Sequence, residues 1–165
     1  MKYSIKIRLI SALLVLLSLV GMANAFALGA KIHLVAADYP VEEGGSYSGM
    51  EEIAVYLHTF GCLPPNFITK KEAQAMGWSS RAGNLSEVAP GYSIGGDHFG
   101  NYENKLPAAN GKARRWTECD VDADGGFRNG KRVIFSHDGL IFYTENHYNS
   151  FRQVIVKESA KPAKR

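Results

Sequence analysis

Apolar residues in the first half of the chain recur at the spacing of a helix. In "MEEIAVYLHTF", Ile53, Leu57 and Phe60 fall on one helical face. Ser48 with Glu51 forms an S-x-x-E capping box directly before this segment, which predicts the start of a helix there. The glycine that follows Phe60 predicts its end.

Two shorter helical segments follow the breaking sequence "LPPNF". Thr69 with Glu72 forms a second capping box and opens "KKEAQAMGW". Asn84 with Glu87 is a weaker box before a single helical turn, which "APG" ends. The chain up to about residue 90 is therefore expected to be mainly helical.

The second half carries the pattern of strands. The segments "RRWTECDVDA", "KRVIFSHDG" and "LIFYTENHY" are rich in aromatic and β-branched residues and are separated by "DGG", "NG" and "DG" turn signals. Helices followed by hairpin-linked strands predict an α+β fold, in which N-terminal helices pack on one face of a C-terminal antiparallel β-sheet.

Alternation along the strands indicates which side chains share a face. In "WTECDV", Glu118 and Trp116 point to one side and Cys119 points to the other. In "RVIF", Val133 is apolar and Arg132 points the opposite way. Packing Cys119 and Val133 on the helices leaves Glu118 and Arg132 together on the open face.

The N-terminus has the features of a leader. Residues 1–25 combine basic residues, an apolar run and a small-x-small end, which predicts a signal peptide cleaved after Ala25 and a secreted or periplasmic protein. A transmembrane anchor is the alternative, but the apolar run is shorter than the roughly 20 residues that span a bilayer. We expect residues 26–47 to form an arm or linker, residues 48–156 one globular domain, and residues 157–165 a basic tail.

The net charge of the chain indicates no particular function by itself, but one local cluster of charges is informative. The 165-residue chain has 19 basic and 16 acidic residues, a formal net charge of +3. Three basic residues and no acidic ones lie in the expected leader, so the remaining chain has 16 of each sign. This excludes a globally basic nucleic-acid binder. The densest local cluster is "GFRNGKR", where Arg128, Lys131 and Arg132 surround an Asn-Gly turn and need a negative partner.

A carboxylate, several cations and a histidine on one face suit the cleavage of RNA by its own 2′-hydroxyl. A base takes the hydroxyl proton, an acid protonates the leaving oxygen, and fixed cations stabilise the charge at phosphorus. This chemistry needs neither a metal nor a cofactor, and the histidines show no metal-ligand spacing. From these residues alone, a cross-strand ion pair between Glu118 and Arg132 and a surface role for His147 are the commoner alternatives.

Longer blocks in the same order along the chain resemble one family. They are "LPPNFITKKEAQAMGW", "GNLSEVAPGYSIGGDHFGNYENKLP", "RRWTECDV", "GGFRNGKRVIFS" and "GLIFYTENHYNSF". Residues from about 50 to 154 resemble the barnase-type, guanyl-preferring family of secreted bacterial ribonucleases. The resemblance implies the microbial ribonuclease fold and a monomeric, metal-independent endoribonuclease that cleaves single-stranded RNA without a cofactor.

The resemblance also implies catalytic roles, position by position. Glu118 matches the general base and His147 the general acid. Arg128 and Arg132 match two arginines that grip the scissile phosphate. Lys70, at the start of the second expected helix, matches a lysine that reaches the same phosphate.

The loop "HFGNYEN" matches the guanine-binding loop of the family. Glu103 corresponds to the carboxylate that accepts hydrogen bonds from the guanine edge. The backbone and aromatic residues that match the rest of this site are Gly100, Asn101, Tyr102, Phe99 and Tyr148. We interpret Asp97 and Trp116 as structural.

Three features depart from the family. Tyr102 stands where some members have an arginine, so the strength of the guanine preference and the fit of a barstar-like acidic inhibitor depend on this change. The segment "AANGKAR" is longer than its counterpart. Cys62 and Cys119 are not a general feature of the family. In an exported protein we expect them to form a disulfide, because Cys119 faces the helices and Cys62 follows the first one.

Two alternatives stay open at this point. One is an RNA-binding or inhibitor-docking module that keeps the fold without turnover. The other is an antibacterial ribonuclease toxin that is delivered into competing cells. A cleavage assay separates the first alternative from an active enzyme.

Overall fold

The computed structural model describes residues 28–109 and 114–158. The signal peptide expected at residues 1–25 lies outside these ranges, as do most of the expected basic tail and part of the segment "AANGKAR". Within the described ranges, no helix is both long and apolar enough to cross a membrane.

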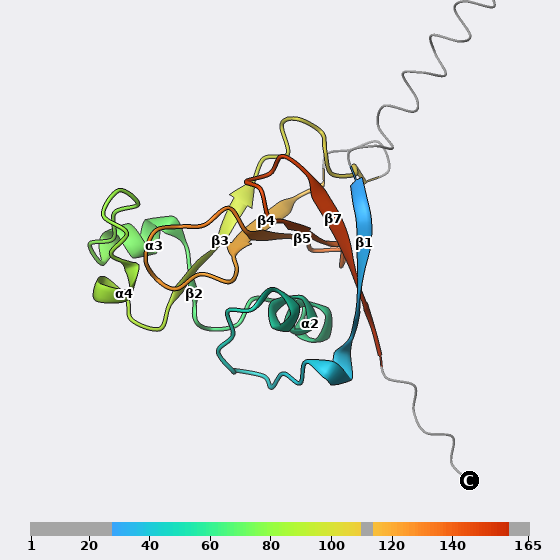
Figure 1. The fold of residues 1–165 in the computed structure, drawn as a ribbon, viewed down its shortest axis with the longest axis horizontal. Coiled ribbons are helices and arrows are strands. Elements are labelled where there is room, and N and C mark those ends of the chain that lie inside the picture. The colour runs from blue at the N-terminus through green and yellow to red at the C-terminus, as the bar shows by residue number, and fades with distance from the viewer. Residues whose placement is uncertain (1–27, 110–113, 159–165) are drawn as a thin grey trace, which may run out of the picture.

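Seven strands form one sheet in the order β1-β7-β6-β5-β4-β3-β2 (Figure 1). The strands are β1 Leu28–Val35, β2 Phe67–Ile68, β3 Ser93–Phe99, β4 Trp116–Asp120, β5 Arg132–Ser136, β6 Ile141–Thr144 and β7 Phe151–Lys157. The helical elements are the 3-10 turn η1 Ala36–Asp38 and the α-helices α2 Met50–Phe60, α3 Lys70–Ala75 and α4 Leu85–Val88.

The three segments predicted as strands form β4, β5 and β6, but the sheet is not antiparallel throughout. The junctions from β3 to β7 are antiparallel, whereas β1 with β7 and β2 with β3 are parallel. Parallel neighbours need long connections. The segment with α3 and α4 connects β2 to β3, and nearly the whole domain connects β1 to β7. The fold is therefore mixed α/β, built around a mixed sheet.

Helix α2 lies against one face of the sheet (Figure 1). It buries Ile53, Ala54 and Leu57 in a cluster that includes Cys119 and Val133. These two strand residues point toward the helix, in agreement with their alternation. The main hydrophobic core thus lies between α2 and the sheet.

The two shorter helices do not share this core. They enclose a separate apolar cluster at the β2–β3 end of the sheet, which includes Ala73, Trp78, Leu85 and Ile94 (Figure 1). α3 and α4 therefore depart from the single layer of helices that the sequence suggests. Their own small core holds them in place and sets the start of α3 beside β3.

A third cluster fills the opposite face of the central strands. It contains Trp116, Ile134, Phe142 and Phe151, with Leu106 from the loop after β3. Trp116 is buried, and its ring meets that of Phe142 edge-on with 5.6 Å between centroids. This cluster supports the loops that carry the polar residues described below.

The capping box of α3 forms as predicted, and that of α2 is displaced. The Thr69 N–H donates to Glu72 Oε2 at 2.8 Å, and the Glu72 N–H donates to Thr69 Oγ1 at 3.3 Å. At α2, Glu52 accepts from the Gly49 N–H at 3.3 Å, one residue later than the box predicted at Ser48.

The weaker third box does not form. Asn84 Oδ1 accepts from the Ser79 N–H at 2.9 Å, and Asn84 Nδ2 donates to the Gly77 carbonyl at 3.2 Å. The asparagine thus fastens the preceding turn, and α4 follows without a side-chain cap.

Cys62 and Cys119 are both free thiols, so the structure does not contain the expected disulfide. Cys119 is fully buried between the sheet and α2, where loss of solvent raises the pKa of its thiol. Cys62 is exposed just past the end of the helix. An orientation toward the helices is not sufficient to bring the two sulfurs together.

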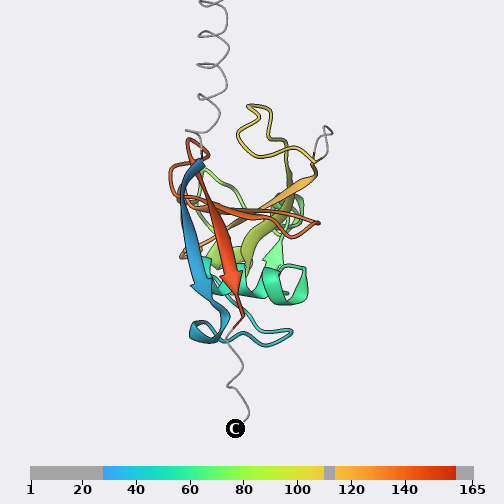
Figure 2. The same cartoon turned by 90° about the vertical axis from the view of Figure 1, so that its right-hand side faces the viewer.

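The segment 26–47, expected as an arm or linker, contains an edge strand. β1 runs beside β7 and parallel to it (Figure 2). Leu34 is 6 % exposed and joins the cluster around α2, whereas Val35 is 40 % exposed. The alternation here is limited to Ile32 and Leu34, which is too short a pattern to identify a strand.

We expect Leu34→Ala to lower the free energy of unfolding by about 2–4 kcal/mol, because it leaves a cavity in the main core. Val35→Ala is the matched control and should change it by less than about 0.5 kcal/mol. Urea unfolding measures both values. Equal stability of the two variants would show that β1 is not part of the cooperative folding unit.

Candidate active site

Glu118 lies in β4 on the face turned away from α2. Its side chain is 9 % exposed, and both carboxylate oxygens are occupied. Oε1 accepts from Lys70 Nζ at 2.6 Å, and Oε2 accepts from the Tyr148 hydroxyl at 2.7 Å. Two donors from distant parts of the chain therefore fix one carboxylate.

Asp97 fastens the start of α3 to the sheet. Its Oδ2 accepts from the Lys70 backbone N–H at 2.9 Å and lies 4.0 Å from Lys70 Nζ. In the pairing of β3 with β4, Asp97 sits opposite Glu118, just after an irregularity at Gly96. Gly96 has a φ of +94°, a left-handed value that favours glycine. This bulge therefore directs Asp97, and through it Lys70, toward Glu118.

The cations of "GFRNGKR" face two carboxylates. Arg128 contacts Asp120 at two points, from Nε to Oδ2 at 2.7 Å and from Nη2 to Oδ1 at 2.6 Å. Arg132 is 1 % exposed and places its Nε 2.9 Å from the same Oδ1. Lys131 belongs to a separate pair, with its Nζ 3.0 Å from Asp122.

Asp120 is a site residue that the sequence-based prediction missed. It is 3 % exposed and stands directly opposite Arg132 in the pairing of β4 with β5. Its hydrogen bonds raise the pKa of the Arg128 guanidinium, against the opposing effect of burial. The available signal was alternation, since Asp120 shares a strand face with Glu118.

The loop between β6 and β7 carries His147 and docks on the turn within "GFRNGKR". The His147 N–H donates to the Gly130 carbonyl at 3.0 Å. A Cβ at Gly130 would lie 3.3 Å from that nitrogen and 3.2 Å from the Glu145 carbonyl oxygen, so this close approach favours glycine. The imidazole is exposed and lies beside the Tyr148 ring, with 5.3 Å between centroids.

Tyr148 links this loop to Glu118. Burial, and then the hydrogen bond to Glu118 and its negative charge, raise the pKa of Tyr148 to about 12. The hydroxyl therefore stays protonated and donates to the carboxylate throughout the physiological pH range. The Tyr148 ring also stacks on Phe99, with 5.2 Å between centroids and 29° between planes.

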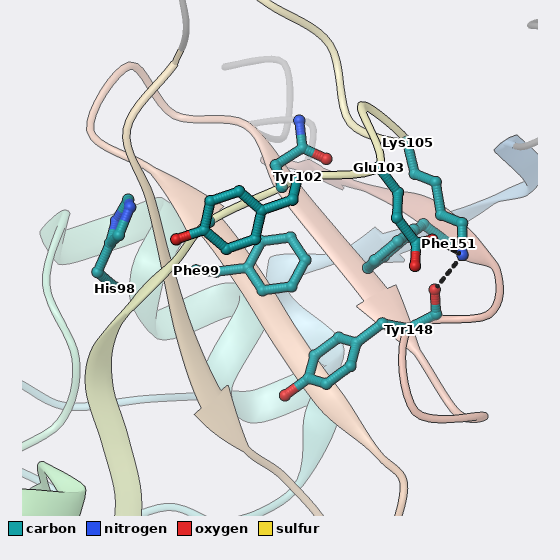
Figure 3. A pocket seen from close by; sticks show the side chains of 9 residues that line it. His98, Phe99, Tyr102, Glu103, Lys105, Tyr148 and Phe151 are labelled. Atoms are coloured by element: carbon teal, nitrogen blue, oxygen red, sulfur yellow. Dashed lines mark hydrogen bonds and ion pairs between the residues drawn. The ribbon is translucent and has the colours of Figure 1, made fainter.

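A pocket of about 260 Å³ lies beside these groups, under the loop after β3 (Figure 3). Its lining residues are His98, Phe99, Gly100, Asn101, Tyr102, Glu103, Lys105, Tyr148 and Phe151. The Asn101 side chain shapes the loop by bonding both backbone polar groups of Leu106, at 2.9 and 3.0 Å. Tyr102 is 91 % exposed, and its ring folds back against Gly100. A Cβ at position 100 would collide with that ring, so the contact requires glycine.

Lys105 connects two sides of this pocket (Figure 3). Its Nζ lies 2.5 Å from Glu103 Oε2 and donates to the Tyr148 carbonyl at 3.0 Å. Lys105 is not identifiable as a site residue from the sequence, because nothing in "NKLP" distinguishes it from a solvated surface lysine.

The expected site residues form two adjoining groups. Lys70 contacts Glu118, and Arg128 and Arg132 contact Asp120. His147 joins this group through the Tyr148 ring and the Gly130 carbonyl. The expected base-binding residues line the pocket, and Tyr148 belongs to both groups. Among the residues that the structure describes, no three histidine, cysteine, aspartate or glutamate side chains are arranged to hold a metal ion. A fixed carboxylate and several cations therefore lie beside an aromatic pocket. This arrangement defines a protein that is suited to bind an anionic ester next to a planar ring and to act on that ester.

Proteins of similar sequence agree with this description. A family model described as ribonuclease matches residues 50–155. A ribonuclease of Heyndrickxia coagulans is 49 % identical over 102 residues, which cover 62 % of this chain and 92 % of that protein. Ribonucleases of Bacillus intermedius and Bacillus pumilus are also 49 % identical over 102 residues, and the chain spans 62 % of the length of each. The chain belongs to the ribonuclease family, which confirms the resemblance in its sequence.

Asp120→Asn should lower the free energy of unfolding by about 3–5 kcal/mol, because it leaves the buried Arg132 guanidinium without its carboxylate. Asp138→Asn is the matched control. That exposed carboxylate pairs with Arg114, and its loss should change stability little. Urea unfolding compares the variants. If Asp120→Asn is as stable as the control, Arg132 does not depend on Asp120.

Proposed function

We propose that the protein is an exported endoribonuclease that cleaves single-stranded RNA on the 3′ side of guanosine. Membership of the ribonuclease family supports RNA cleavage as the class of activity. The observation that carries the proposed mechanism is the Glu118 carboxylate, which is held between Lys70 and Tyr148.

In the first step, Glu118 takes the proton of the 2′-hydroxyl as this oxygen attacks the adjacent phosphorus. The bond from phosphorus to the 5′-oxygen breaks, and protonated His147 gives that oxygen a proton. The products are a 2′,3′-cyclic phosphate and a free 5′-hydroxyl. Water then opens the cyclic phosphate slowly, with the two roles exchanged. DNA lacks the 2′-hydroxyl and is not cleaved.

Fixed cations stabilise the charge that gathers at phosphorus. Lys70 and Arg128 have 37 % and 23 % of their side chains exposed, so they are the cations best able to contact a bound phosphate. Lys70 Nζ already lies 2.6 Å from Glu118 Oε1. A phosphate bound to Lys70 therefore lies within reach of Glu118, the general base. Arg132 is almost fully buried, so we assign it to holding Asp120 and raising the positive potential nearby.

Guanine binds in the aromatic pocket. Glu103 accepts hydrogen bonds from its N1 and N2 edge, and backbone groups from Gly100 to Tyr102 donate to O6. Phe99 and Tyr148 are in direct contact, so the base stacks on the outside of this pair rather than between the rings. Such stacking contributes about 1–3 kcal/mol per base.

Glu118→Gln and His147→Gln should each lower the rate of RNA cleavage by about 10²–10⁴-fold, because each removes one proton transfer. The exposed Glu87 and His137 provide matched controls, since Glu87→Gln and His137→Gln should keep the parent rate. Mass spectrometry of products from a defined RNA reports the cut positions and the cyclic phosphate. If the parent protein binds RNA tightly and leaves it intact, a binding module is supported and the enzyme is excluded.

Glu103→Gln should lower kcat/KM for GpU by about 10–100-fold, since hydrogen bonds to a charged group contribute about 1.5–3 kcal/mol. The value for ApU should change much less, because adenine does not present the same donors. Steady-state kinetics on the two dinucleotides measures the ratio. An equal loss on both substrates would show that Glu103 does not read the base.

A further inference from the structure

We propose that Lys105 is a positioning residue that couples base recognition to the loop carrying His147. This inference rests on the proposed function and adds a residue to it. Lys105 acts through Glu103 on one side and through the Tyr148 carbonyl on the other, without touching the reacting atoms.

The Lys105 side chain crosses from the loop after β3 to the loop before β7 (Figure 3). Its Nζ meets Glu103 Oε2 at 2.5 Å and the Tyr148 oxygen at 3.0 Å. An exposed ion pair contributes little by itself, and Glu103 is 73 % exposed. The Lys105 side chain is 28 % exposed and makes a second bond, so its ammonium is better fixed than that of an isolated surface pair.

The Tyr148 carbonyl is a sensitive point of the histidine loop. Tyr148 follows His147 and has a left-handed φ of +68°, which is unfavourable for a residue with a bulky side chain. Contacts must therefore hold it in place. Its N–H donates to Thr144 Oγ1 at 3.1 Å, its hydroxyl donates to Glu118, and its carbonyl accepts from Lys105. Loss of Lys105 removes the contact to the Tyr148 carbonyl, which is the one that comes from the base-binding pocket.

The same ammonium also acts on the carboxylate that reads the base. Guanine brings N–H donors to Glu103, so the carboxylate can bind the base and keep its pair with Lys105. Adenine presents an acceptor at N1, which repels the carboxylate and disturbs that pair. The disturbance passes through Lys105 to the Tyr148 carbonyl and to the adjacent His147. The identity of the base then changes the chemical step as well as binding.

Lys105→Met keeps most of the side-chain length and removes the charge. We expect it to lower kcat for GpU by about tenfold, a size typical of coupling between sites. We also expect the ratio of kcat for GpU to kcat for ApU to fall toward one. Lys105→Arg should restore most of both quantities, because a guanidinium can still bridge the two oxygens.

Lys71→Met is the matched control, because Lys71 is an exposed lysine of α3. It should leave kcat and the kcat ratio unchanged. Combining Lys105→Met with Glu103→Gln separates the two contacts. The double variant should lose further kcat through Tyr148, while its GpU-to-ApU ratio should equal that of Glu103→Gln alone.

The inference is wrong if Lys105→Met keeps the parent kcat and kcat ratio, or if it lowers kcat equally on both substrates, whether or not arginine restores the activity. Thermal unfolding of each variant identifies any loss of fold. If Lys105→Met does not fold, Lys105→Gln replaces it, with the same expected fall in the kcat ratio. A parent protein that cleaves neither dinucleotide would overturn the proposed function itself, which distinguishes the two failures.

Discussion

The arrangement of the site depends on one buried carboxylate, that of Asp120. Arg128 and Arg132 carry like charges within a tight turn segment, and they would repel each other without a shared counter-ion. Asp120 accepts two hydrogen bonds from Arg128 and lies 2.9 Å from Arg132. The same turn offers the Gly130 carbonyl on which the histidine loop docks. A single buried charge in β4 thus fixes both the cations and the backbone of His147.

Polar contacts between loops and strands assemble the rest of the site. Asp97 ties α3 to β3, the Tyr148 hydroxyl ties the histidine loop to β4, and Lys105 ties that loop to the pocket. The partners in these contacts are 27 to 43 residues apart in the chain. The sheet supplies the frame, because the register of β3 against β4 sets Asp97 opposite Glu118.

The features that could be predicted from the sequence are those set by residues close together in the chain. Alternation and turn signals located β4, β5 and β6, and they placed Glu118 and Cys119 on opposite faces. Asp120 and Lys105 escaped prediction because their importance comes from partners that only the tertiary structure supplies. Four strands were not predicted: β1, β2, β3 and β7. The short apolar pattern of β1 and the glycines of β3 give little local signal, and both strands form through pairing with distant segments, which local propensity does not record.

The N-terminal strand extends the frame on which the site rests. The family match begins at residue 50, so β1 lies before it. β1 pairs with β7 from Phe151 onward, and Phe151 is buried where the histidine loop enters the sheet. Its ring lines the pocket and lies 6.1 Å from that of Phe99. The register pairs Leu28 of β1 with Phe151 and Gly29 with Arg152, so β1 contacts β7 at its first two residues. The pairing with β1 therefore restrains the residue from which both the pocket wall and the histidine loop begin.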